Sequence, residues 1–119
     1  MNHGRVCRAQ DRQCLIPNAG LTSNIFERMR GLLGAPRLKT EEALLIRPCS
    51  SVHTIGMNYA IDLAFMDKNW TIIKIVRNLK PWRMAACPAA HMVLELLGGG
   101  IDRLQLTRGL QLAWQDEQA

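Results

Sequence analysis

The segment from Cys49 to Asp67 gathers side chains that can do chemistry. It carries a thiol, two serine hydroxyls, the imidazole of His53 and the carboxylate of Asp62, beside a run of apolar residues typical of a buried strand. A cysteine with a histidine as its base, oriented by a carboxylate, is the arrangement that thiol enzymes use. Cys49, His53 and Asp62 are therefore one candidate catalytic set, although the local signatures of known cysteine enzymes are absent.

Two Cys-x3-His pairs give a second alternative. Cys49 with His53, and Cys87 with His91, can supply four ligands for tetrahedral zinc. The chain lacks the tight Cys-x2-Cys spacing that makes zinc ribbons recognisable, so we expect neither a metal nor a cofactor. If Cys49 and Cys87 meet in space, they form a redox pair instead.

Two carboxylates, Asp62 and Glu95, interrupt apolar runs that read as strands. A buried carboxylate needs a hydrogen-bond or cationic partner, and Arg30 is the candidate cation for a structural ion pair. Trp82, in the segment Lys-Pro-Trp-Arg, can cover a pocket from a loop. We therefore expect a polar binding pocket built from Arg30, His53, Asp62, Trp82 and Glu95.

One helix and several short strands must position these side chains. Apolar residues at helical spacing predict the helix over residues 22–33, with Gly34 and Pro36 ending it. A short hairpin is expected over residues 4–15, and a turn at Pro17 to Gly20. Further strands are expected at residues 43–46, 61–66, 71–76, 92–97 and 110–114, with a helical turn at 101–104.

This order of elements predicts an α+β fold in one domain of 119 residues. We expect a curled or barrel-like, mainly antiparallel sheet with one main helix. Residues 78–88 are expected to be irregular, held by Pro81 and Pro88, and residues 115–119 to form a polar tail. The 48% hydrophobic content fits a single core.

The composition of the chain limits the classes of partner that we expect. The formal charge is +5, but the 15 basic residues are spread along the chain and aromatic residues make up only 5%, so a nucleic-acid partner is not expected. No apolar run is long enough to span a bilayer, and no apolar region follows the basic N-terminus as in a signal peptide. We expect a cytoplasmic protein with an unidentified ligand or protein partner and no membrane partner.

Several motifs occur together in a familiar order: Arg-Gly-Leu-Leu-Gly at Arg30, Ser-Ser-Val-His-Thr at Ser50, Ile61-Asp62 leading into Phe65, and Val-Leu-Glu-Leu at Val93. Over residues 21–112 the chain resembles the domain-of-unknown-function 192 family, in its Ser-Ser-Val-His-Thr branch. The resemblance implies a small single domain of mixed α/β structure with no established activity.

The chain also departs from the family pattern. His53 to Gly56 stands where many members carry Trp-Met-x-Asn, and Ala60 replaces the proline of Pro-Leu-Asp. Roles of that tryptophan or asparagine therefore do not transfer. We expect a non-enzymatic binding or accessory module with a polar pocket at strand and loop ends. The alternative is a cysteine- or metal-dependent enzyme, or a redox protein, centred on Cys49, His53 and Cys87.

Overall fold

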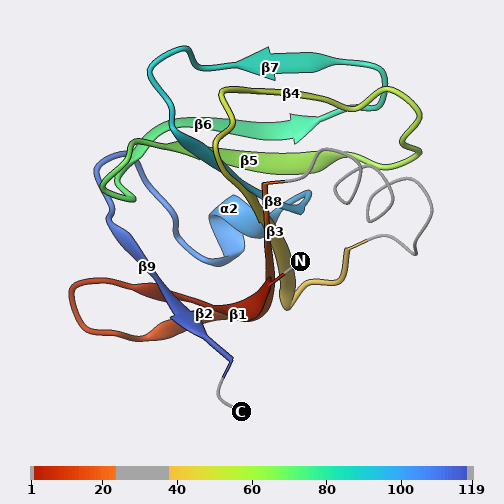
Figure 1. Ribbon diagram of the computed structural model, residues 1–119. Coiled ribbons are helices and arrows are strands. Elements are labelled where there is room, and N and C mark those ends of the chain that lie inside the picture. Colours follow the sequence, from red (N-terminus) through yellow and green to blue (C-terminus); the bar gives the residue numbers. More distant parts are fainter. Residues whose placement is uncertain (1, 24–37, 118–119) are drawn as a thin grey trace.

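The computed structural model describes residues 2–23 and 38–117 (Figure 1). Strands dominate these residues, and the single helix among them is four residues long. The elements are β1 (Asn2–Arg8), β2 (Cys14–Thr22), β3 (Glu42–Ile46), β4 (Ser51–His53), β5 (Ile61–Met66), β6 (Ile72–Leu79), β7 (Met84–Ala86), β8 (Met92–Leu97), α2 (Gly100–Arg103) and β9 (Leu112–Asp116).

Seven strands form one mixed sheet in the order β6-β5-β8-β3-β2-β1-β9. Only β2 and β3 run parallel, and the other neighbours are antiparallel. The sheet curls until its two edges meet at one isolated bridge, Thr71 with Gln111, so it is not a closed barrel. The predicted α+β fold with a curled, mainly antiparallel sheet is confirmed.

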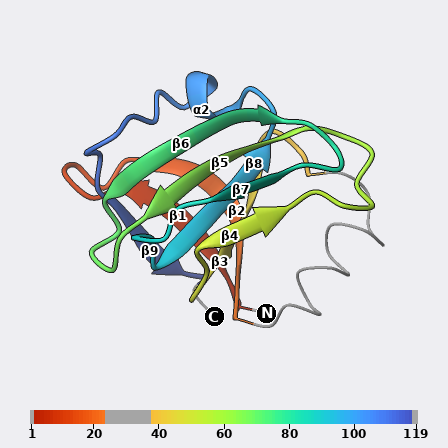
Figure 2. The same cartoon turned by 90° about the horizontal axis from the view of Figure 1, so that it is seen from above.

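A second sheet of two strands, β4 and β7, covers part of the outer face of the large sheet (Figure 2). Two apolar cores result. One lies inside the curl and includes Leu45, Leu94 and Ile101, while the other lies beneath β4 and β7 and includes Phe65, Val52 and Val93. The β4–β7 sheet is therefore an outer layer that rests on its own apolar core.

The burial of strand β5 explains the nearly continuous run of apolar residues in its sequence. Its alternate residues, Ile61, Leu63 and Phe65, enter the core beneath β4 and β7, while Ala64 and Met66 enter the core inside the curl. All six residues of the strand are buried. A strand covered on both faces loses the polar alternation of a half-exposed strand.

The turn predicted at Pro17 to Gly20 is wrong, because these residues lie within β2. The hairpin itself exists, with Cys7 opposite Cys14. Between the pairs Gly4–Ala19 and Val6–Ile16, β2 contains one residue more than β1, which makes a bulge at Pro17 and Asn18. Proline has no amide to donate to a ladder, and a bulge is one of the few places in a sheet that tolerates it.

Two further expectations need correction. Residues 78–88 are not wholly irregular, since β6 continues to Leu79 and β7 occupies Met84–Ala86. The polar tail does not begin at residue 115, because Gln115 and Asp116 belong to β9 and pair with β1. Short strands such as β7 pack on one side only, so they lack the apolar runs from which strands are predicted.

The helix predicted over residues 22–33 falls almost entirely outside the described residues. Its first position, Thr22, is the last residue of β2. The helical turn predicted at residues 101–104 is confirmed by α2, one residue earlier.

Candidate functional site

The exposed large apolar side chains of the described residues gather on the β4–β7 layer. Ile55 is 48% exposed, Trp82 63% and Met84 70%. Ile55 follows β4, Trp82 precedes β7, and Met84 begins it. We call this surface, together with His53, Lys80 and Arg83, the β4–β7 face.

Register and burial decide which side chains point outward. Val52 pairs with Ala85 and packs into the core beneath the layer. Side chains alternate along a strand, so the next pair, His53 with Met84, points away from that core. Because cross-strand partners share a face, the imidazole lies beside the exposed thioether.

Thr54, which is fully buried, organises the β4–β7 face. Its hydroxyl donates a hydrogen bond to the carbonyl of Lys80 at 2.6 Å and accepts one from the backbone amide of Arg83 at 2.9 Å. Its backbone amide donates to the carbonyl of Arg83, and its carbonyl accepts the amide of Trp82 at 3.0 Å. These bonds hold Trp82 at a φ of 63°, in the left-handed region. The loop that presents the indole is therefore held by hydrogen bonds to the end of β4.

The positive excess of the chain lies in the two sequence segments that contain β4 and β7. Residues 43–61 and 68–94 contain six lysines and arginines and no aspartate or glutamate. Elsewhere the chain has nine basic and ten acidic residues, so these two segments account for the entire positive excess. Four of the six cations have partners: Arg47 lies over the Trp70 ring, Lys74 donates to the carbonyl of Ala86, Arg77 bridges to Asp102, and Arg83 donates to the carbonyl of Trp82 at 3.3 Å. Lys80 and Arg83 lie exposed beside Trp82.

The pocket predicted from the sequence is only partly assembled. His53 and Trp82 both lie in the β4–β7 layer. Glu95 pairs with Leu63 and faces the core beneath that layer, whereas Asp62 pairs with Leu96 and faces the core inside the curl. The two carboxylates thus lie on opposite faces of the large sheet, and Arg30 is outside the described residues.

Asp62 is hydrogen-bonded to backbone amides from two distant segments. One carboxylate oxygen accepts the amide of Asn78 at 2.8 Å. The other accepts the amides of Gly99 at 3.1 Å and Ile101 at 3.0 Å. This carboxylate, 1% exposed, joins β5 to the irregular end of β6 and to the start of α2. Its observed partners are therefore backbone amides, and its role is structural. The ion pair predicted with Arg30 falls outside the described residues and stays a prediction.

Among the described residues, the cysteine and histidine candidates do not form a metal centre. The backbone amide of Cys49 donates to the carbonyl of His91 at 3.0 Å, and that of Cys87 to the carbonyl of Ser50 at 2.8 Å. The redox pair of Cys49 and Cys87 stays a prediction. All four cysteines are free thiols, and the thiol of Cys49 donates to the carbonyl of Ser51 at 3.1 Å. Within residues 2–23 and 38–117, no three His, Cys, Asp or Glu side chains lie as a metal centre would need. The set Cys49, His53, Cys87 and His91 therefore does not have the arrangement of a metal centre. Asp62 lies across the large sheet from His53.

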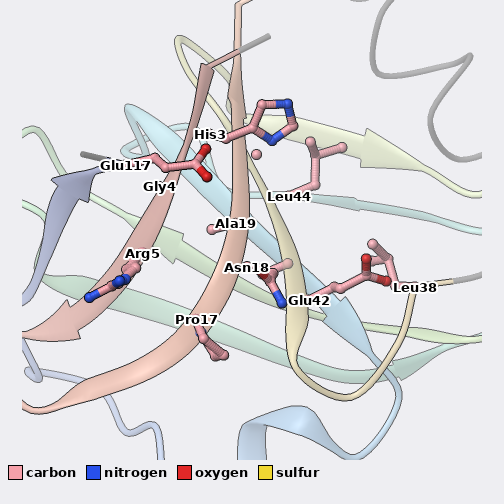
Figure 3. Close-up of a pocket in the computed structure, with 12 residues that line it drawn as sticks. His3, Gly4, Arg5, Pro17, Asn18, Ala19, Leu38, Glu42, Leu44 and Glu117 are labelled. Carbon is pink, nitrogen blue, oxygen red and sulfur yellow. The ribbon is translucent and has the colours of Figure 1, made fainter. Parts of the chain in front are cut away.

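A cavity of about 500 Å³ lies over β1, β2 and β3 (Figure 3). Its polar lining mixes both charges: His3, Arg5, Asn18, Glu42 and Glu117. One oxygen of Glu42 already accepts the amide of Lys39 at 2.8 Å. Among the described residues of its lining, no single charge or hydrogen-bond type prevails, so they select no class of ligand.

Sequence reasoning missed Thr54, Ile55 and Met84. One signal was available in the sequence, namely the absence of acidic residues from positions 43–61 and 68–94. The second signal, exposure, depends on which way two three-residue strands turn their side chains, and the sequence pattern does not give it.

Comparison with known proteins agrees with the fold. The model of the domain-of-unknown-function 192 family, described as "Uncharacterized ACR", matches residues 7–114. A UPF0127 protein from Thermococcus sibiricus is 26% identical over 103 residues, which are 82% of this chain and 66% of that protein. The chain thus spans slightly less than two thirds of that relative's length.

Two solved structures are similar in fold. A proposed transcription regulator from Sinorhizobium meliloti has a TM-score of 0.77 and 21% identity, covering 95% of this chain and 92% of that one. A protein of unknown function from Novosphingobium aromaticivorans has a TM-score of 0.69 and 22% identity, covering 94% and 84%. In the described part of this chain, no helix has the length and apolar character to cross a membrane.

Proposed function

Because the chain belongs to the domain-of-unknown-function 192 family, whose description assigns no activity, we propose its function from its own surface. The protein is a non-enzymatic binding module, and its β4–β7 face docks an acidic, apolar segment of a partner protein. The observation that carries this proposal is the coincidence of exposed Ile55, Trp82 and Met84 with segments that hold cations and no carboxylates.

The residue types on this face match those of protein interfaces. Tryptophan, methionine and arginine are enriched at interface cores, and tryptophan and arginine dominate among residues that carry binding energy. Trp82, Arg83 and Met84 are consecutive and exposed. Thr54 fixes the loop, so little ordering entropy is lost when a partner binds.

Charge decides which proteins fit. With Lys80 and Arg83 exposed and no acidic residue in either flanking segment, a basic partner is repelled and an acidic one is attracted. The apolar side chains add a requirement for aliphatic or aromatic groups between the partner's carboxylates. The occupant is therefore an acidic segment with interspersed apolar residues.

Two other macromolecules fit less well. Binding of single strands depends on several aromatic platforms for bases, whereas two of the three exposed apolar side chains are aliphatic. Recognition of anionic lipid typically uses clusters of four to eight cations, whereas two cations, Lys80 and Arg83, flank Trp82 here. A protein partner can contact both the three exposed apolar side chains and the two cations beside Trp82.

A titration of ¹⁵N-labelled protein with a short synthetic peptide of glutamate and leucine tests the proposal. We expect amide shifts around Ile55, Trp82 and Met84, with affinity falling as salt rises. The Trp82→Ala variant should bind about tenfold more weakly or worse, as a hot-spot residue does. Lys80→Glu and Arg83→Glu should weaken binding further, whereas Arg108→Glu makes the same charge change elsewhere and should leave affinity unchanged.

Three results would overturn this function. They are shifts confined to another surface, equal binding of a peptide with lysine in place of glutamate, and tighter binding of phosphatidylserine vesicles or single-stranded DNA than of the acidic peptide. The vesicle and DNA outcomes would each replace the protein partner with another class of macromolecule.

Four free thiols among the described residues support a cytoplasmic location as part of the same proposal. Fractionation of cells that express the chain at its native level tests this location.

A further inference from the structure

Cys7 and Cys14 face each other across the β1–β2 hairpin. They are direct register partners on antiparallel strands. Cys7 is buried at 6% exposure, and Cys14 is exposed at the end of β2. The pair lies on the large sheet, in elements that contribute nothing to the β4–β7 face.

The hydrogen bonds around this pair place the two side chains close together. On the turn side of this pair, the backbone amide of Arg8 donates a hydrogen bond to the carbonyl of Gln13 at 2.9 Å. The register of the hairpin shifts between Val6 and Cys7, but Cys7 and Cys14 lie on the turn side of that shift, next to the Arg8–Gln13 bond. Bonded and non-bonded pairs alternate in an antiparallel ladder, so Cys7 and Cys14 form a non-bonded pair, whose Cα atoms are typically about 4.5 Å apart. That spacing falls within the range of about 4.4–6.8 Å that a disulfide requires.

The surroundings of Cys7 show that the two thiols interact. Its pKa is raised, first by burial and then by the neighbouring Cys14 thiol, through charge and a side-chain hydrogen bond, while Arg5 acts in the opposite direction. The Cys7 thiol also lies 3.9 Å from the amide oxygen of Gln115. An oxidant reaches the exposed Cys14 sulfur first, because the Cys7 thiol is buried and stays protonated. Cys14 is therefore the thiol that is oxidised first, and Cys7 is the thiol that then closes the disulfide.

We propose that Cys7 and Cys14 are a dithiol site that a hydroperoxide converts into an intramolecular disulfide. The Cys14 thiolate attacks the peroxide oxygen, the O–O bond breaks, and the sulfenic acid of Cys14 forms with release of one water from hydrogen peroxide. The Cys7 sulfur then attacks the Cys14 sulfur as its own proton leaves, and the displaced hydroxide takes up a proton as the second water. Two thiols are oxidised by two electrons, and one peroxide is reduced to two waters.

The disulfide would close the turn between β1 and β2. Strand β1 lies between β2 and β9, so this link fixes the edge of the sheet that β9 completes. Cross-linking restricts the unfolded chain, so the oxidised protein should unfold at a higher temperature than the reduced one, and dithiothreitol should reverse the difference.

Treatment of the full chain with one equivalent of hydrogen peroxide tests the proposal. Free thiols should fall from four to two. Trypsin cleaves after Arg5, Arg8, Arg12 and Arg28, so mass spectrometry should find the peptide 6–8 joined to the peptide 13–28. The rate of closure should not depend on protein concentration, because the reaction is intramolecular. The Cys49→Ser/Cys87→Ser double variant should form the same link, and Cys14→Ser should form none.

A Cys7→Ala variant separates the two steps. Its Cys14 should accumulate a sulfenic acid that dimedone traps, whereas the parent chain should show little trapping. The proposal is overturned by a link between any other pair of cysteines, by disulfide-bonded dimers as the main product, or by trapping at Cys14 in the parent chain without loss of the Cys7 thiol. None of these results bears on peptide binding at the β4–β7 face.

Discussion

The hydroxyl of Thr54 lies 2.6 Å from the carbonyl oxygen of Lys80, a residue 26 positions further along the chain. The same hydroxyl accepts the amide of Arg83. One buried side chain thus connects the end of β4 to the loop that precedes β7. The position of Trp82 on the surface depends on this connection, which links the packing of the small sheet to the β4–β7 face.

Replacing Thr54 with valine should destabilise the protein and loosen the β4–β7 face. The change keeps the shape of the side chain but removes the hydrogen-bond partner of two partly buried backbone groups, which costs about 1–3 kcal/mol. Urea unfolding measures this loss, and affinity for the acidic peptide should fall with it. Thr54→Ser keeps the hydroxyl and is the matched control; equal behaviour of the two variants would show that the hydroxyl does not organise the loop.

Replacing Trp82 with alanine should leave stability nearly unchanged while it weakens binding. The side chain is 63% exposed, and substitutions on the surface away from special features usually stay within about 0.5 kcal/mol. Thermal unfolding of the free variant checks this separation of folding from binding. A large loss of stability would instead make Trp82 a cover for the core.

Replacing Asp62 with asparagine should destabilise the fold by about 3 kcal/mol. The charged carboxylate accepts three backbone amides, and hydrogen bonds to charged groups contribute more than neutral ones. An amide side chain keeps only one of the two acceptor oxygens. Denaturant unfolding gives the value, with Asp67→Asn as the comparison, because Asp67 accepts two amides in the more exposed β5–β6 turn. A similar effect at both positions would contradict the special role of Asp62.

Replacing Gly4 with alanine should separate β1 from β9. A Cβ there would lie 2.4 Å from the carbonyl oxygen of Gln115 and 2.6 Å from the Trp114 ring. Overpacking of this kind typically costs about 1–3 kcal/mol, which unfolding by urea would register. At Gly98 the nearest atom would lie 3.4 Å away, so Gly98→Ala is the matched control and should cost less.

Cys7 should make the reduced protein less stable at alkaline pH. Burial and the nearby Cys14 raise the pKa of Cys7 in the folded state above its ordinary value of 9.0. The folded state therefore keeps the thiol proton to a higher pH than the unfolded state does. Stability is unaffected below the pKa of the unfolded state, and it falls as pH rises from that pKa through the pKa of the folded state. Unfolding in dithiothreitol between about pH 8 and 10 should show a shallower decline for Cys7→Ala than for the parent chain. Parallel declines would contradict the shift.

Local sequence patterns identified most of the large sheet. The apolar runs of β3, β5 and β8 gave strands near their observed bounds, since strands buried on both faces carry continuous apolar residues. The same reasoning misplaced a turn at Pro17 to Gly20, because proline and glycine signal both turns and bulges. Register, rather than composition, distinguishes those two structures.

The sequence by itself determined the fold class, the family, and the fact that Asp62 and Glu95 needed special surroundings. These conclusions follow from the order and polarity of neighbouring residues. Only the tertiary structure decided that the two carboxylates lie on opposite faces, that Ile55, Trp82 and Met84 are exposed at the β4–β7 layer, and that Cys7 meets Cys14. Each of these depends on strand register and on packing between segments distant in the chain, and side chains that meet across such distances leave no periodic signal in the sequence.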